Sequence, residues 1–188
     1  MVGEMTRNAL PAVLAAAILL AATGACGDDG GDPGDDRRAA SVRVTAADYE
    51  FRGVPESVPT GARLELANAS RAEVHELVAV RLPDGETRAV DEILQLPEEK
   101  LGRLLSDDAV ATVLVAAPES AGSIMVGDGT LDRPGRYAIV CFLPTGADPD
   151  QVMQAVEAFD PKSGEEPQLP TAGPPHIVHG MFTELTVR

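Results

Sequence analysis

From residue 41 onward, hydrophobic and polar side chains alternate over short segments, as in half-buried β-strands. Val42, Val44 and Ala46 alternate with polar neighbours, and Tyr49 and Phe51 continue the extended pattern. Comparable segments recur along the chain, at residues 62–68, 74–82, 123–126, 136–142 and 182–187. Gly, Pro and Asn separate them at a spacing of about ten residues, which is typical of sandwiches. We therefore predict an all-β, Greek-key β-sandwich.

Two segments depart from the strand pattern. Residues 90–108 carry leucines and Ile93 at helical spacing, and Pro97 fits the start of a second short helix. We expect this segment to be a helical insertion packed on the sandwich. Residues 109–117 are apolar and fit either a helix or a strand. The long segment 143–175 contains a second predicted helical insertion at residues 150–159.

The N-terminal segment is predicted to be a signal peptide that covers residues 1–25. Its apolar run, residues 9–23, is shorter than the roughly 20 residues that span a bilayer, and Arg7 supplies a basic flank. The run ends in small residues followed by Cys26, which resembles a bacterial lipobox. The resemblance implies that Cys26 is lipidated and anchors the protein to the extracytoplasmic face of a cell membrane. The alternatives are ordinary secretion after cleavage near residue 25 and an uncleaved anchor.

Residues 26–40 are predicted to link this anchor to the folded domain. Residues 27–36 contain only Gly, Asp and Pro, so they cannot enter a core, and their charges repel one another. This composition indicates a flexible acidic tether, with residues 41–188 as one domain. If Cys26 is lipidated, Cys141 is the one cysteine of that domain, because the chain has two. A lone thiol is then buried, paired with another molecule or bound to a metal.

Composition and charge narrow the classes of partner. Thirty acidic residues against 15 basic ones give a net charge of −15, and aromatic residues make up 3% of the chain. Binding to a phosphate backbone depends on Lys and Arg, and single-stranded nucleic acids stack on aromatic rings. Nucleic acid is therefore not an expected partner.

The residues with metal-binding chemistry are one thiol, three imidazoles and a thioether. Cys141 stands at the end of the buried strand at 136–142, His75 stands at the start of an earlier one, and His176, His179 and Met181 precede the last. One thiolate, two imidazoles and a weak thioether are the donors that select copper in electron-transfer sites. Taken alone, Cys141 and Met181 are more often core residues, and His75 is more often a histidine at the surface or at a strand end.

The order of these motifs resembles that of the cupredoxins, the blue-copper proteins. The N-terminal half of the resemblance consists of residues 47–51, 58–61, 66–68 and the pair His75-Glu76. The C-terminal half consists of residues 134–137, Cys141, and His176 followed at a fixed spacing by Gly180-Met181. The resemblance implies a single type-1-like copper ion, with His75, Cys141 and His176 as equatorial ligands and Met181 as the axial ligand.

The chain departs from that family in the spacing of two ligands. Residues 142–175, 34 in all, separate Cys141 from His176, where most cupredoxins have only a few residues. Closing a longer loop costs little, about 0.6 kcal/mol per doubling of its length, so a site can persist if both loop ends are anchored. The longer segment also makes His179 a rival to His176, and the sequence leaves that choice open.

The predicted function is electron transfer by a membrane-tethered, extracytoplasmic copper protein with a redox protein partner. The sequence contains no nucleophile–base pair and too few histidines for the trinuclear cluster of the copper oxidases, so we do not expect an enzyme. Two alternatives remain. One is a cupredoxin-like binding or assembly module without a redox role, which would use segment 143–175 as its partner-facing surface, and the other is a copper carrier.

Overall fold

The computed structural model describes residues 40–160, 163 and 167–188. The chain divides into two units, Met1–Asp36 and Arg37–Arg188, and all described residues belong to the second. The predicted signal peptide, the lipidation of Cys26 and nearly all of the predicted tether lie outside the described residues and stay predictions. Among the helices that the structure describes, none is long and apolar enough to cross a membrane.

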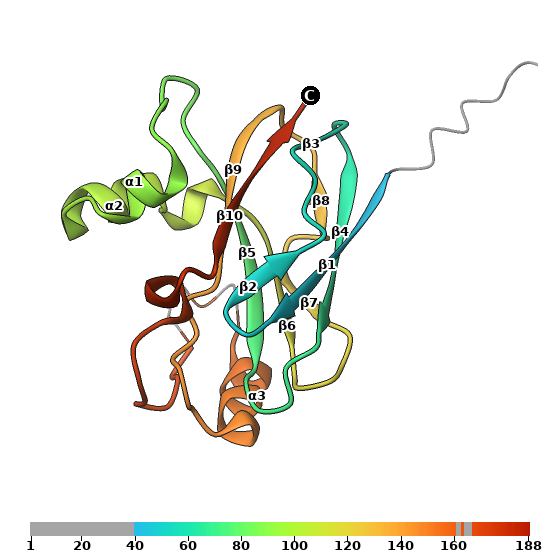
Figure 1. Cartoon of the computed structure of the whole chain (residues 1–188), viewed down its shortest axis with the longest axis vertical. Coiled ribbons are helices and arrows are strands. Elements are labelled where there is room, and N and C mark those ends of the chain that lie inside the picture. Colours follow the sequence, from blue (N-terminus) through green and yellow to red (C-terminus); the bar gives the residue numbers. More distant parts are fainter. Residues whose placement is uncertain (1–39, 161–162, 164–166) are drawn as a thin grey trace, which may run out of the picture. The chain divides into compact units, whose positions relative to one another are not determined.

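Two β-sheets form the body of this unit, as predicted (Figure 1). The ten strands are β1 (Ser41–Ala47), β2 (Glu50–Arg52), β3 (Ser57–Val58), β4 (Ala62–Asn68), β5 (His75–Arg81), β6 (Val110–Ala116), β7 (Ser123–Val126), β8 (Thr130–Leu131), β9 (Gly135–Val140) and β10 (Phe182–Val187). One sheet has the order β2-β1-β4-β8 and the other the order β3-β10-β9-β5-β6-β7. β1 runs parallel to β4, β3 runs parallel to β10, and the other pairs are antiparallel.

The central strands of the six-stranded sheet are buried on both faces, which explains their nearly continuous apolar sequences. Leu77 and Ala79 of β5 contribute to the core between the sheets, whereas Val78 and Val80 contribute to a second cluster. β9 divides in the same way: its residues 137 and 139, with Cys141 beyond it, face the main core, and residues 138 and 140 face the second cluster. Side chains two apart share a face, so His75 and Cys141 both point between the sheets.

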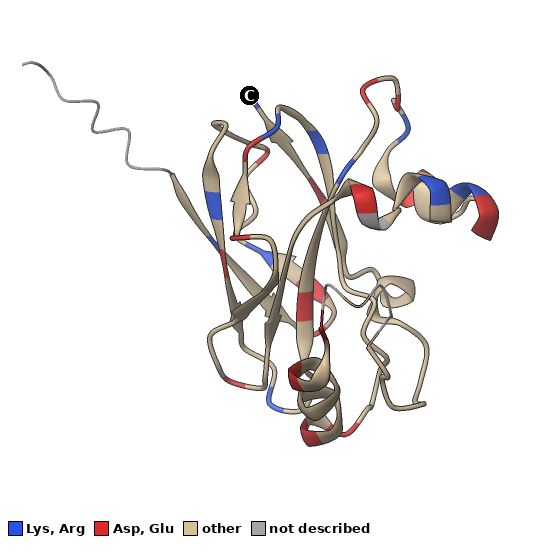
Figure 2. Ribbon diagram, turned by 180° about the vertical axis from the view of Figure 1, so that it is seen from behind, with Lys and Arg blue, Asp and Glu red and all other residues tan. Residues whose placement is uncertain are grey.

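The helical insertion covers the second cluster. It consists of α1 (Val90–Leu94), α2 (Glu98–Leu104) and the 3₁₀ turn η1 (Asp107–Ala109). Ile93 of α1 is fully buried in that cluster. The helix predicted at 150–159 is α3 (Pro149–Ala158), whose Val152 and Val156 join the main core. Acidic residues stand in the first turns of α1, α2 and α3 (Figure 2), where they interact favourably with the helix dipole.

The observed secondary structure differs from the prediction at one turn and adds several short elements. The prediction that Tyr49 continues the extended strand is wrong: Asp48 and Tyr49 form the turn between β1 and β2, with φ values of 47° and 67°. The ambiguous segment 109–117 is mostly the strand β6. β3 and β8 were not predicted, because strands of two residues are too short to leave an alternating pattern. The 3₁₀ turn η2 (His176–His179) was also not predicted.

A buried asparagine holds the turn between β4 and β5. The side-chain amide of Asn68 donates to the backbone oxygens of Glu73 and Ala116, at 2.8 and 3.0 Å. Its oxygen accepts from the backbone N–H of Ser70 at 2.8 Å. These three bonds satisfy backbone groups that would otherwise be buried without partners. Asn68 thereby fixes the segment that leads into His75.

We expect Asn68→Ala to lower the free energy of unfolding by about 2–3 kcal/mol, because it leaves buried backbone groups without partners. Urea unfolding of the domain measures the change. Gln95→Ala serves as the control, since the side chain of Gln95 is exposed just after α1 and bonds only the backbone oxygen of Asp91. Equal midpoints for the two variants would contradict the role assigned to Asn68.

Candidate metal centre

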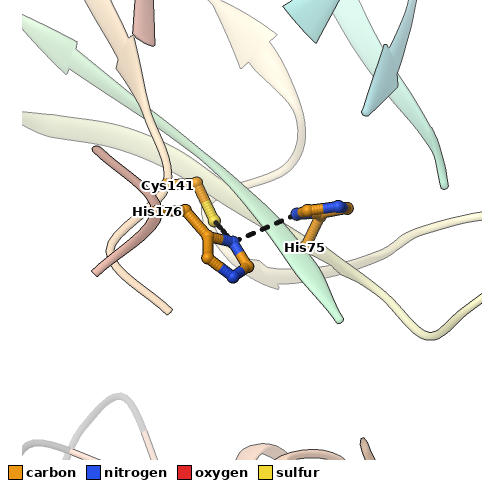
Figure 3. A group of neighbouring side chains, drawn as sticks. All are labelled: His75, Cys141 and His176. Atoms are coloured by element: carbon orange, nitrogen blue, oxygen red, sulfur yellow. Dashed lines mark hydrogen bonds between the residues drawn. The ribbon is translucent and has the colours of Figure 1, made fainter. Parts of the chain in front are cut away.

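Three of the predicted ligands converge at one end of the sandwich. The Nδ1 atoms of His75 and His176 are 3.2 Å apart, and Cys141 Sγ is 3.3 Å from His176 Nδ1 (Figure 3). One donor atom from each residue lies within 4.8 Å of the other two. All three side chains are completely buried. Residues that are 35 to 101 positions apart in the chain thus form one cluster.

The two neighbouring strands β5 and β9 position His75 and Cys141. β5 pairs with β9 up to Val78 and Val140, and the chains continue side by side beyond that pair. The backbone N–H of Glu76 donates to Cys141 Sγ at 3.4 Å, and the Glu76 carboxylate accepts from the backbone N–H of Phe142 at 2.8 Å. The carboxylate therefore replaces the backbone partner that Phe142 lacks once the strand pairing ends. This bond fixes the chain immediately after Cys141.

The long segment between Cys141 and His176 returns to the point where it left. The backbone N–H of His176 donates to Leu143 O at 3.0 Å, and that of Ile177 donates to Cys141 O at 3.0 Å. Further along, Thr145 N donates to Pro174 O and Gly173 N donates to Thr145 O. Both ends of the segment are thus joined by backbone hydrogen bonds, which is the condition under which a longer loop preserves the site.

The structure distinguishes the two rival histidines. His176 is completely buried within the cluster, whereas His179, one turn of η2 later, is exposed and stacks on Tyr49 with ring centroids 4.9 Å apart. Met181 is completely buried. Its backbone oxygen accepts from Cys141 N at 3.2 Å, and its N–H donates to His176 O at 3.2 Å. Met181 is therefore a direct neighbour of both Cys141 and His176.

The donor set fits a metal ion, and specifically copper. The Nε2 atoms of both imidazoles are buried without a hydrogen-bond partner, while their Nδ1 atoms face each other and the thiol. Two imidazole nitrogens bound to one ion at about 2.0–2.1 Å in a trigonal arrangement are roughly 3.5 Å apart, close to the 3.2 Å observed. Two nitrogens and one sulfur are the equatorial donors of a single type-1 copper site.

Burial sets the protonation of the cluster without metal. Desolvation, followed by the charge of Glu76, raises the pKa of the Cys141 thiol well above its ordinary value. Burial lowers the pKa of His75 to about 4, with a smaller contribution from His176. Burial also lowers the pKa of His176, against the opposing effect of Glu73. At neutral pH both imidazoles are therefore uncharged and able to bind a metal, whereas the thiol must lose its proton to do so.

Three residues around the cluster were not predicted as parts of a site. Glu73 lies beside His176, Tyr49 covers the imidazoles, and burial raises the pKa of Glu76 to about 7. Glu76 was recognised only as part of the pair with His75. The sequence did contain a signal for Glu73 and Glu76. Both carboxylates lie within two residues of His75 at the start of a buried strand, where charged side chains seldom occur without a partner.

Comparison with known proteins gives structural neighbours only. No protein family profile and no curated protein matches the chain. Among solved structures, auracyanin B is 19% identical, with a TM-score of 0.41 over 80% of this chain and 89% of that one. Auracyanin from Roseiflexus castenholzii is 16% identical, with a TM-score of 0.43 over 80% and 98%. Auracyanin A from Chloroflexus aurantiacus, described as a "blue" copper protein, is 13% identical, with a TM-score of 0.40 over 80% and 99%.

These superpositions are loose, so the likeness to cupredoxins rests on the chain's own geometry. The two sheets of the sandwich bring a histidine at a strand start, a cysteine after the penultimate strand and a histidine before the last one to the same end. The predicted resemblance in fold and in donor set is confirmed at this level. The arrangement can hold one soft metal ion in surroundings that exclude water, and such surroundings influence a redox potential.

The buried thiol predicts a loss of stability in alkali. Burial raises the pKa of the Cys141 thiol in the folded state, so the protonated thiol contributes to the free energy of unfolding. This contribution is fully present below the thiol's ordinary pKa of about 9 and is lost as the pH rises above that value. Above that pH, we expect the free energy of unfolding of the metal-free protein to fall by about 1.4 kcal/mol per pH unit more steeply than that of Cys141→Ala. Urea unfolding between pH 8 and about 10.5 compares the two slopes. Parallel slopes would contradict a buried, protonated thiol.

Proposed function

We propose that the protein is an extracytoplasmic, membrane-tethered copper protein that transfers single electrons. The observation that supports this most directly is the complete burial of His75, Cys141 and His176 with their donor atoms within 4.8 Å of one another. Bound copper would supply a one-electron change between its two common oxidation states. The chain's own contribution is to hold the donors in place and to keep water away from them.

In this proposal His75, Cys141 and His176 are the equatorial ligands and Met181 is the axial ligand. His75 Nδ1, Cys141 Sγ and His176 Nδ1 face a common point. Met181 is buried beside them, bonded through its backbone to Cys141 and His176. A thioether is the usual weak axial donor to a trigonal His₂Cys set. Because strand pairing and the returning segment hold the ligands, little rearrangement would accompany a change of oxidation state.

Burial favours electron transfer over copper delivery. A carrier that hands copper to another protein needs ligands that the recipient can reach, but all three donors are fully buried and the ring of Tyr49 lies 5.0 Å from that of His176. Electrons can pass through a few ångströms of protein, whereas an ion cannot be exchanged through them without opening the site. We therefore propose a carrier of electrons, not of copper, that acts as a redox partner and not as an enzyme.

The place of action follows from the N-terminal sequence. An apolar segment, Cys26 and an acidic linker are expected of a lipoprotein that is exported and then anchored. Residues 27–40, 14 in number, would act as a flexible tether with a root-mean-square length of about 20 Å. The charges of its aspartates favour longer extensions. The copper domain would thereby stay close to the membrane, where it meets membrane-bound redox partners.

Copper binding gives the decisive experiment. Copper(II) added to the purified domain 37–188 is expected to produce an intense visible thiolate-to-copper absorption band, because Cys141 is a ligand. Cys141→Ser and His176→Ala should each abolish the band. The matched control is His179→Ala, which removes the neighbouring exposed imidazole and should leave the band unchanged.

Each alternative outcome has a meaning. Copper uptake without the band would favour a copper carrier, and no uptake at all would favour the non-redox binding or assembly module. Loss of the band in His179→Ala but not in His176→Ala would overturn the assignment of the second imidazole.

The anchor is tested separately with the full chain. Expressed in a bacterium that processes lipoproteins, the full chain should fractionate with membranes and carry a lipid on Cys26 detectable by mass spectrometry. Cys26→Ser should release the protein into the soluble extracytoplasmic fraction, because one thiol carries the lipid. A membrane-bound Cys26→Ser protein would refute lipid anchoring while leaving the copper site untouched.

A further inference from the structure

The second ring nitrogen of His176 faces a single charged group. Its Nδ1 points at Cys141 and His75, while its Nε2 lies 3.5 Å from a carboxylate oxygen of Glu73. This Nε2 is completely buried and has no other polar partner. A buried N–H needs an acceptor, and metal-binding histidines commonly direct their second nitrogen toward a carboxylate. Glu73 is the acceptor that the structure provides.

The carboxylate of Glu73 is itself held by several donors. Its two oxygens lie 3.1 and 3.2 Å from the backbone N–H of Gly146, and one of them accepts from the hydroxyl of Tyr49 at 3.3 Å. The backbone of Glu73 is fixed as well, because its oxygen accepts from the Asn68 amide and its N–H donates to the Ser70 hydroxyl. Glu73 is therefore aimed at His176 by groups from three parts of the chain.

Tyr49 takes up an unfavourable backbone conformation to reach this position. It is the second residue of a two-residue turn and has a φ of 67°, a value that favours glycine or asparagine. Non-glycine residues kept in the left-handed region tend to occur at functional sites. Here the conformation brings the hydroxyl onto Glu73 and the ring to within 5.0 Å of the His176 ring.

We infer that Glu73 is a positioning residue for His176. It accepts the Nε2 proton, so that the unprotonated Nδ1 faces Cys141 and His75, and it ties the imidazole to the turn at Gly146. The tautomer assigned to His176 concerns the metal-free protein, whereas the effect of Glu73 on copper binding rests on the proposed function. A fixed tautomer presents the binding nitrogen before the metal arrives.

The tautomer of His176 is the first test and needs no metal. Nitrogen-15 NMR of the metal-free domain distinguishes protonated from unprotonated ring nitrogens, and the chain has only three histidines to assign. We expect His176 of the wild type to carry its proton on Nε2. A proton on Nδ1 in the wild type would overturn the inference without any variant.

Glu73→Gln supplies the second test. A glutamine replaces one of the two oxygens with an NH₂ group, which donates and cannot accept. Both Glu73 oxygens face the Gly146 N–H and one also faces His176 Nε2, so the NH₂ group must oppose at least one N–H donor. We expect the variant to populate both tautomers and to bind copper about 10-fold to 100-fold more weakly, the usual effect of removing such a partner. The matched control is Glu65→Gln on β4, whose carboxylate accepts from Ser41 and Arg43 instead. It should match the wild type in both measurements.

The outcomes separate the two proposals. If the wild type binds copper with the thiolate band and Glu73→Gln keeps the wild-type tautomer and affinity, the role of Glu73 is refuted and the copper function stands. If the wild type binds no copper but holds the Nε2 tautomer that Glu73→Gln loses, the copper function fails and the positioning role stands.

Discussion

Two backbone hydrogen bonds, from His176 to Leu143 and from Ile177 to Cys141, hold the metal centre together. They close a segment of 34 residues onto the end of β9, so the two ligands that flank the segment stay together. Because loop-closure entropy grows slowly with length, the extra residues cost little once their ends are joined. The insertion is also partly self-supporting, since Val152 and Val156 of α3 join the main core.

Most of the fold could be predicted from the sequence, because its strands and helices follow local rules. The alternation in β1, β4 and β10 gave the right elements, and the helical insertions are α1, α2 and α3. The cluster of His75, Cys141 and His176 was predictable for a different reason. The order of the motifs resembles that of the cupredoxins, and that resemblance implied that these three residues bind one ion. In the structure, the start of β5 and the end of its antiparallel neighbour β9 meet at one end of the sandwich.

The surroundings of the cluster could not be predicted in the same way. The positive φ of Tyr49 could not be predicted, because the turn at Asp48 and Tyr49 contains no glycine, the usual sequence signal for this backbone conformation. The choice of His176 over His179 depends on how η2 begins, at a backbone bond to Leu143 that is a tertiary contact. The same holds for Glu73, whose partners Gly146 and Tyr49 are distant in the sequence.

Departures from local rules gather at one end of the protein. Far from the cluster, ion pairs such as Arg136–Glu184 lie near the surface, and apolar side chains fill the core. Around the cluster, by contrast, a tyrosine occupies a glycine-like conformation, His75 Nε2 is buried without a hydrogen bond, and burial opposes ionisation of Glu76 and Cys141. Each of these features destabilises a protein that only needs to fold. A cation bound to Cys141 Sγ and to the Nδ1 atoms of both imidazoles would offset part of this cost, because it displaces the thiol proton and neutralises charge in buried surroundings. The concentration of such features at one end therefore indicates a site and not a defect of packing.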